Sequence, residues 1–405
     1  MSNKQKIPYF FLVLFIIAFS ISPSYTLGDD NRNLLLIVIM CLSPILIIVY
    51  NKYRKTDVWI LFFMSFIIIF PLLYQPQSMR WSTVLYSCMF CLSFIAYTHL
   101  LAISKPLPIQ YLKILKTLIF AYFITLLIQQ LCILLGLPIF NISNYDPTTP
   151  WKLNSLSAEP SHSSRILALL MYCYVTIKEL LSNREYTFKT HFKEDKWVWI
   201  AFFWSMITMF SGTAYLFIII IFFKIFNLKN LKSIFVFIVL FFIITQFLGL
   251  TPFIRTYNTL IATLSLDTAA IIEADHSASI RIVPFFVLAN MVSLNSLDGW
   301  LGHGIDHVSS FLSDFLPGVK DGITGGGMFQ VWIEYGFICF ALFVAFSLYI
   351  SYKKGDYISI FFWFMLVFLY GVNNQIVWLC LILLFTNKYF LKRSIIKNKL
   401  QNENS

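Results

Sequence analysis

Apolar residues fill most of this chain in long runs that short polar segments separate. In chain order the runs cover residues 7–24, 33–50, 58–75, 83–103, 117–137, 164–181, 197–211, 213–227, 233–250, 329–350, 358–372 and 375–391. Most approach the roughly 20 apolar residues that a helix needs to cross a hydrocarbon core about 30 Å thick. Because a helix bonds its own backbone polar groups, it is the structure that such runs adopt in lipid. The pattern predicts an all-α polytopic membrane protein with about twelve transmembrane helices.

The composition agrees with this prediction. Of the 405 residues, 59% are hydrophobic and 12% are charged, which leaves too few polar side chains to cover a soluble globule. We therefore expect a single membrane domain over residues 1–405, with the first apolar run kept as a helix rather than a cleaved signal. The net charge of +11 is assigned to membrane topology and not to nucleic-acid binding.

Lysine and arginine predict how the helices are oriented. If both termini are cytoplasmic and alternate loops lie on opposite sides, about 23 of the 30 Lys and Arg fall on the cytoplasmic side. This topology leaves two enlarged periplasmic loops, 138–164 and 251–328. The second contains an amphipathic stretch at 278–294 that we expect to lie at the membrane surface.

Lysine alone would satisfy the rule that cytoplasmic loops carry an excess of positive charge. Five arginines nevertheless fall on the periplasmic side in this topology: Arg32, Arg80, Arg165, Arg255 and Arg281. The planar guanidinium suits bidentate contact with phosphate or carboxylate. Ordinary solvated arginine at the interface is the alternative, and it is favoured for Arg32 and Arg80.

The first loop ends in a cluster of candidate site residues. Lys152, Glu159, Pro160, His162 and Arg165 follow one another there, and the proline suits the first turn of a helix. The membrane edge lowers the local dielectric and so strengthens contacts with an anionic ligand. Glu159 and His162 are candidate catalytic groups, and the two cations are candidate anion ligands. The alternative is that Glu159 caps the helix while His162 and Arg165 extend to the surface.

The second loop contains Arg281 and then the element Gly302-His303-Gly304. Glycine-bounded turns let backbone N–H groups approach a phosphate or a sugar closely. His303 is a further candidate catalytic group, and glycines also occur from Gly322 through Gly327. An ordinary turn explains a Gly-His-Gly element equally well.

His303, Asp306 and His307 also suggest metal ligands, since a spacing of four places two histidines on one face of a helix. The neighbouring glycines argue against a helix at this point, and no third ligand is obvious. We therefore expect no metal site.

Glu334, about one turn into the tenth predicted helix, is the clearest intramembrane carboxylate. An ionisable group at such depth is a functional candidate by default, with capping or an interfacial position as the alternative. The middles of the predicted helices otherwise lack the charged chain that a secondary transporter usually needs. Their polar residues are typical of helix packing: Gln129, Gln130, Gln246, Asn373, Asn374 and Gln375.

Five short motifs follow a recognisable order along the chain: Glu159-Pro160-Ser161, Ser211-Gly212-Thr213, Arg281, Gly302-His303-Gly304 and Glu334-Tyr335-Gly336. Together with the span count and the two enlarged outer loops, they resemble the O-antigen ligase and polymerase superfamily. Within it the chain is most similar to the O-antigen polymerases of the Wzy type. The topological resemblance covers the whole chain, whereas each motif is short.

Two departures from the family pattern bear on this resemblance. The family often has an arginine about seven residues before the Glu-Pro-Ser glutamate, and this chain has Lys152. The ligase pattern often has His-Asn about nine residues before the Glu-x-Gly glutamate, and this chain has Gly325-Gly326. The second departure favours polymerase over ligase.

The resemblance implies a metal-independent glycosyltransferase in the bacterial inner membrane, without a cofactor. It would transfer a growing polysaccharide from one undecaprenyl-pyrophosphate carrier to a repeat unit on another, with a chain-length regulator as a possible protein partner. We assign Arg281 and Arg165, helped by Lys152, to the pyrophosphate. Glu159 is the favoured base and His162 or His303 the second choice. The alternatives are an O-antigen ligase and a lipid-linked oligosaccharide flippase or other transporter.

Overall fold

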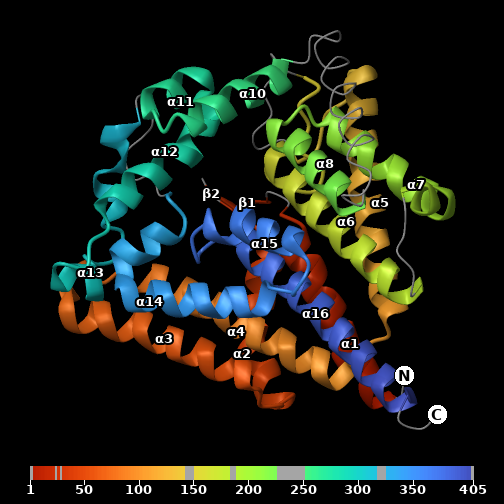
Figure 1. The fold of residues 1–405 in the computed structure, drawn as a ribbon, viewed down its shortest axis with the longest axis horizontal. Helices are drawn as coiled ribbons and strands as arrows, with labels where there is room; N and C mark the ends of the chain where they lie inside the picture. The colour runs from red at the N-terminus through yellow and green to blue at the C-terminus, as the bar shows by residue number, and fades with distance from the viewer. Residues whose placement is uncertain are drawn as a thin grey trace. The chain divides into compact units, whose positions relative to one another are not determined.

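The computed structural model describes residues 3–22, 25–27, 30–141, 150–182, 188–225, 251–316 and 325–402. These ranges are helical apart from one hairpin, in which β1 (Tyr25–Leu27) pairs antiparallel with β2 (Asp30–Arg32). The longer α-helices are α1 (Asn3–Ser20), α2 (Leu34–Val49), α3 (Lys55–Tyr74), α4 (Trp81–Ser104), α5 (Pro108–Leu134), α6 (Pro160–Ser182), α7 (Phe188–Thr208), α8 (Gly212–Ile225), α10 (Thr251–Leu264), α12 (His276–Met291), α14 (Met328–Ser351) and α16 (Gln375–Asn402) (Figure 1). Shorter elements are α11 (Thr268–Ala274), α13 (Leu297–Leu301), α15 (Tyr357–Trp363), the 3-10 helices η1 (Pro76–Ser78), η3 (Val308–Ser310) and η4 (Leu312–Phe315), and the π-helix η5 (Phe364–Phe368).

The predicted helical class is confirmed. Eleven of the twelve predicted apolar runs lie on helices, namely α1 to α8, α14, α15 with η5, and α16. The run at 233–250 lies outside the described residues. In the described part of the chain, five helices are long and apolar enough to cross a membrane: Lys55–Tyr74, Trp81–Ser104, Pro108–Leu134, Met328–Ser351 and Gln375–Ser394. The protein is therefore a multi-pass membrane protein, while the full count of about twelve spans stays a prediction.

The chain divides into two compact units, and each is described by itself. Unit 1 comprises Met1–Val38, Ser104–Ile254 and Leu383–Ser405, and unit 2 comprises Ile39–Ile103 and Arg255–Ile382. Both are assembled from segments distant in sequence. The expected single membrane domain concerns the whole chain in lipid and stays a prediction.

In unit 1, α6 is the central helix. Residues 163–177 are buried without interruption, and α6 packs against α5, α7 and α8 (Figure 1). A helix enclosed on all sides is expected to be apolar all round, as most of α6 is. The polar groups at its N-terminus are therefore held by a rigid, buried element.

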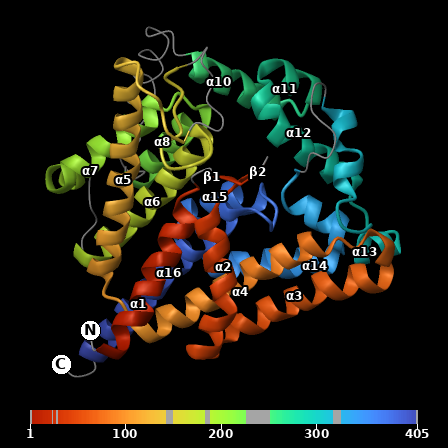
Figure 2. The ribbon, with the colours of Figure 1, turned by 180° about the vertical axis from the view of Figure 1, so that it is seen from behind.

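Three helix ends gather at one end of unit 1. The start of α1, the N-terminal end of α5 and the end of α16 lie at the same end of the unit (Figures 1 and 2). This is the arrangement expected if both chain termini lie on one side of the membrane. Their assignment to the cytoplasm stays a prediction.

In unit 2, α14 runs beside α3 and also packs against α12 and α13 (Figure 2). A buried apolar cluster joins α10, α11 and α12 to the η3–η4 segment and to Ile333 of α14. The stretch predicted at 278–294 is largely the helix α12, which contributes Val283 and Leu288 to this cluster. Its expected position at the membrane surface stays a prediction.

Candidate functional site

The first candidate site lies at the N-terminus of α6 in unit 1. The helix begins at Pro160, as the proline predicted, because a missing N–H costs nothing in the first turn. The backbone carbonyl of Glu159 accepts hydrogen bonds from the N–H groups of His162 and Ser163, both at 3.1 Å. Glu159 therefore occupies the position that caps the helix, and its side chain lies next to the first turn.

The side chains of Glu159 and His162 form a pair. His162 Nε2 lies 3.4 Å from Glu159 Oε1, and their side chains are 32% and 26% exposed, respectively. The Ser161 hydroxyl also donates to this carboxylate oxygen. A carboxylate beside an imidazole, both reachable from solvent, is an arrangement that can accept and transfer a proton.

Arg165, one turn further along α6, is only 4% exposed. The alternative in which it merely extends to the membrane surface does not fit this burial. A buried guanidinium at the end of a core helix is positioned by its surroundings, which favours recognition of an anion over solvation.

Hydroxyl groups connect this helix end to the segment Ser211-Gly212-Thr213. Ser164 Oγ lies 2.9 Å from Thr213 Oγ1, which in turn lies 2.8 Å from Ser211 Oγ. Ser164 Oγ also donates to the backbone carbonyl of Ser161 at 2.9 Å, so this residue links the Glu159-Pro160-Ser161 motif to the distant Ser211-Gly212-Thr213 motif within unit 1.

Gln129 of α5 anchors the loop that precedes α6. Its amide nitrogen donates to the carbonyl of Phe140 at 3.0 Å, and its Oε1 accepts from the backbone N–H of Ser155 at 2.9 Å. The sequence interpretation gave Gln129 a role in helix packing, and that was incomplete because its hydrogen bonds go to the loop, including the side chain of Asn154 at 3.4 Å. Gln130 does join helices, since it accepts from Trp204 of α7 at 3.1 Å.

Lys152 lies on this anchored loop but outside the helix. Its side chain is exposed, and its ammonium makes no ion pair within the described part of the chain. The structure therefore brings Glu159, His162 and Arg165 together on one helix end, and Lys152 lies on the loop that precedes it.

The second candidate site lies in unit 2, where α14 is interrupted at Gly336. This residue has φ 85° and ψ 165°, which breaks the helical hydrogen bonding around it. The carbonyls of Ile333 and Glu334 instead accept from the backbone N–H groups of His303 at 2.7 Å and Gly304 at 3.3 Å. The Gly302–Gly304 segment thus satisfies the carbonyl groups that the break exposes.

Glycine is required at these contacts by packing within the protein. A Cβ at Gly302 would lie 2.4 Å from the Glu334 carbonyl oxygen, and one at Gly304 would lie 2.1 Å from Ser78 Oγ. From the sequence we predicted that this close approach, and the N–H groups of the turn, serve to bind a substrate. The N–H groups of His303 and Gly304 are bonded to α14, and a contact between these glycines and substrate stays a prediction.

Glu334 is a buried carboxylate beside the helix break. It is 3% exposed, and its Oε1 accepts from Gln330 Nε2 at 3.1 Å. The hydroxyl of the next residue, Tyr335, is also buried. The interfacial alternative for Glu334 does not fit this burial, and the residue stays a functional candidate.

The histidines of the second loop stack on each other. The rings of His303 and His307 are 4.9 Å apart at 14°, with His303 exposed. Partial burial and the neighbouring His303 lower the pKa of His307, while the charge of Asp298 opposes this shift. Asp306 is paired with Arg80 at 2.8 Å. Across the described ranges no group of three His, Cys, Asp or Glu side chains is placed to hold a metal ion.

The predicted external arginines have different surroundings. Arg80 and Arg255 pair with carboxylates, Arg255 through two nitrogens that reach Asp275 Oδ2 at 3.0 and 3.2 Å. Arg281 is partly buried on α12 and belongs to unit 2, whereas Arg165 belongs to unit 1. The side chain of Arg32 and the whole of Gly322 lie outside what the structure describes.

One buried pair was missed at the sequence level. His99 of α4 and Asp57 of α3 lie 2.9 Å apart, with side chains 4% and 5% exposed. Arg54 adds a backbone N–H to the same carboxylate oxygen at 2.7 Å. The pair is separated by 42 residues, so no local motif could indicate it.

The fold and these sites define a helical multi-pass membrane protein with polar clusters at helix ends and at a helix break. Comparison of the chain with protein-family models, curated proteins and solved structures found no match.

Proposed function

We propose that the protein polymerises lipid-linked repeat units of O-antigen or a related surface polysaccharide in the bacterial inner membrane. The growing chain leaves undecaprenyl pyrophosphate and is joined to the next lipid-linked repeat unit. The observation that carries the proposal is the grouping of Glu159, His162 and Arg165 at the N-terminus of α6. A base beside a fixed cation is what this reaction needs.

The chemistry assigns a role to each member of this grouping. The acceptor sugar hydroxyl attacks the anomeric carbon of the donor, the new glycosidic C–O bond forms, and the bond to the pyrophosphate oxygen breaks. Glu159 takes the hydroxyl proton, with His162 at 3.4 Å as its partner or replacement. The departing pyrophosphate keeps the electron pair, and the Arg165 guanidinium stabilises its charge.

The helix end itself favours this assignment. Free N–H groups and the helix dipole attract anions at the N-terminus of a helix. The serine and threonine hydroxyls around Ser164 and Thr213 add neutral donors that suit sugar or phosphate oxygens. Because α6 is enclosed along most of its length, these groups hold their positions without substrate.

Unit 2 contributes candidates that we treat separately. Arg281 is the cation that the family resemblance assigns to the pyrophosphate. Glu334 is held beside Gln330 at the break in α14, and a buried ionisable group in a predicted membrane helix is a functional candidate. The contact of the Gly302–Gly304 segment with Glu334 supports the proposal, because two further family motifs meet there.

The proposal is tested by deleting the gene in its host and complementing it with variants of this chain. The surface polysaccharide is then separated on a gel. We expect Glu159→Gln to shorten or abolish the ladder, because a general base contributes about 10²–10⁴ in rate. Arg165→Lys keeps the positive charge but loses the planar guanidinium that makes bidentate contacts, and we expect it to impair polymerisation as well.

The matched control is Glu273→Gln, an exposed carboxylate on α11, which should leave the ladder unchanged at equal protein level in the membrane. One repeat unit still attached to the core, with no longer chains, indicates a polymerase. Loss of all attached sugar with polymer on the carrier indicates a ligase. A normal ladder in the deletion strain would refute both and favour a transporter.

A further inference from the structure

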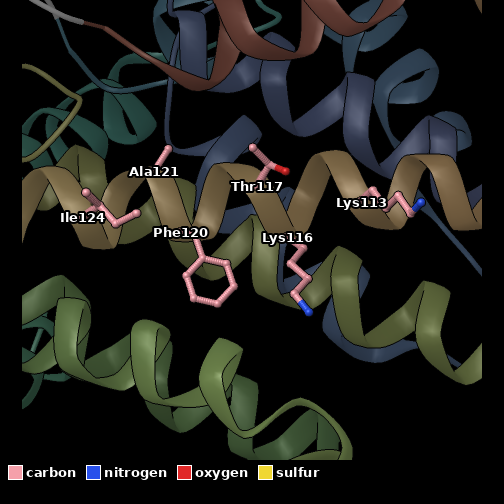
Figure 3. A pocket seen from close by; sticks show the side chains of 6 residues that line it. All are labelled: Lys113, Lys116, Thr117, Phe120, Ala121 and Ile124. Atoms are coloured by element: carbon pink, nitrogen blue, oxygen red, sulfur yellow. The ribbon is translucent and has the colours of Figure 1, made fainter.

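A groove of about 470 Å³ runs along the outer face of α5 in unit 1. The described residues that line it are all on this helix: Lys113, Lys116, Thr117, Phe120, Ala121 and Ile124 (Figure 3). Their spacing follows one stripe of an α-helix, with the cations at one end and apolar side chains beyond them. The volume falls in the range of small-molecule sites, roughly 300–1,000 Å³.

The length of α5 places the two ends of this stripe in different environments. A helix of 27 residues is about 40 Å long, which exceeds a hydrocarbon core of about 30 Å. Where the apolar part of α5 spans the hydrocarbon core, the remaining turns extend into a headgroup region. Only 33% of its apolar window is buried inside the protein, so most of that window is open to surrounding lipid. Lys113 and Lys116 are near the N-terminal end of the helix, and the predicted topology places them at headgroup level with the apolar part of the groove in the hydrocarbon.

Both lysines are available to an anion. Lys113 is exposed and makes no ion pair among the described residues. Lys116 is 47% exposed, and its ammonium lies 3.9 Å from Asp195. That carboxylate has a closer partner, because Lys178 lies 2.6 Å from it and 3.3 Å from Glu194. The end of the groove is therefore positively charged.

We propose that this groove binds an anionic phospholipid. The headgroup phosphate pairs with Lys113 and Lys116, and an acyl chain lies along Phe120, Ala121 and Ile124. From Lys116 to Ile124 the helix rises by about 12 Å, so the groove holds the part of the chain next to the headgroup.

The side chains in Figure 3 fit this assignment. Lys116 and Phe120 extend from the same side of α5, one turn apart. With this alignment, one lipid molecule can place its phosphate against the Lys116 ammonium and the first methylenes of its acyl chain against the Phe120 ring. The N-terminal end of α5 also lies at the same end of unit 1 as the start of α1 and the end of α16 (Figures 1 and 2). The predicted topology makes this the cytoplasmic end, where anionic lipid attracts basic residues.

The test uses the full chain purified in a neutral detergent, with bound lipid counted by native mass spectrometry. Phosphatidylglycerol is the probe, and phosphatidylethanolamine with the same acyl chains is the zwitterionic comparison. Each lysine near an anionic lipid contributes a factor of about five in affinity, so Lys113→Gln with Lys116→Gln should weaken phosphatidylglycerol binding roughly 30-fold. Binding of phosphatidylethanolamine should not change.

Two further variants make the result specific to the groove. Lys52→Gln with Lys55→Gln removes two exposed lysines at the same spacing elsewhere on the chain, and should leave binding unchanged. Ala121→Trp fills the apolar part without changing charge, and should weaken binding of phosphatidylglycerol as well. If Ala121→Trp does not fold, comparison of the two lysine double variants still shows whether phosphatidylglycerol binding is specific to the groove.

Three outcomes would overturn the proposal. Equal binding of the two lipids would show that the headgroup charge is not recognised. Equal loss in both lysine double variants would show attraction by overall charge without a site. Competition by inorganic phosphate, together with unchanged binding in Ala121→Trp, would show an anion site without a lipid chain.

Discussion

Replacing Gly302 with alanine tests whether the turn beside α14 holds the broken helix in place. The new Cβ would lie 2.4 Å from the Glu334 carbonyl oxygen and 2.8 Å from the backbone nitrogen of Tyr335. Both are backbone atoms, so neither can move aside as a flexible side chain does. The turn would have to shift away from α14.

The size of the effect follows from these contacts. Gly302 has φ 94°, and holding a residue with a Cβ there costs about 1–3 kcal/mol. A shift of the turn also weakens the bonds from His303 to Ile333 and from Gly304 to Glu334, each worth about 0.5–1.5 kcal/mol. The expected loss in the free energy of unfolding is therefore roughly 2–6 kcal/mol.

The control for this substitution is Gly355→Ala. Gly355 also has a positive φ, of 84°, but a Cβ there meets nothing within 4 Å. This variant therefore carries the backbone strain without the collision. Each kcal/mol shifts the melting temperature by about 2–4 °C in a domain of 150–250 residues. The two hydrogen bonds, worth together about 1–3 kcal/mol, separate the variants, so we expect Gly302→Ala to melt about 2–12 °C below Gly355→Ala.

The assay is thermal unfolding of the detergent-purified protein, followed by the loss of the monodisperse gel-filtration peak. Expression level and elution position of the unheated variants verify that both fold. If Gly302→Ala melts at the same temperature as Gly355→Ala, the close contact between the turn and α14 does not exist, and the description of the second site is wrong.

Three further predictions use the same assay. Asp57→Ala should destabilise the protein by about 3 kcal/mol, because it leaves His99 buried without its 2.9 Å partner; a change below about 1 kcal/mol would contradict this. Asn387→Leu should raise the melting temperature by a few degrees, since both amide atoms of this buried residue lack partners among the described residues and such groups cost about 1–3 kcal/mol; a lower melting temperature would show that the amide has a partner. Because burial lowers the pKa of His307, the unfolded chain binds its proton more readily as the pH falls below 6.5, and stability should decline there. His307→Phe should reduce this decline, and an identical decline in both proteins would show that His307 is not its source.

The α6 site illustrates how much of a site local sequence can indicate. Pro160 predicted where the helix begins, and Glu159, His162 and Arg165 lie close together because they are neighbours on one helix end. The burial of Arg165 was not predictable, since it depends on α5, α7 and α8, which pack around α6.

The boundaries of α5 show a second kind of limit. The apolar run predicted a start at 117, whereas the helix begins at Pro108. Lys113 and Lys116 interrupt the apolar pattern but not the helix, since lysine is a good helix former. Hydrophobicity therefore located the apolar part of the helix, and the helical backbone begins nine residues before it.

The sequence by itself determined that this is a helical membrane protein and where most of its helices lie. The physical reason is that lipid offers no hydrogen bonds to a backbone, so each long apolar run must satisfy its own polar groups within a helix. Only the tertiary structure decided that α14 breaks at Gly336 and that the turn at Gly302–Gly304 bonds the exposed carbonyls. It also decided that Asp57 meets His99. Such contacts join residues far apart in sequence, and they depend on which helix faces meet, which the hydrophobic pattern of one chain does not encode.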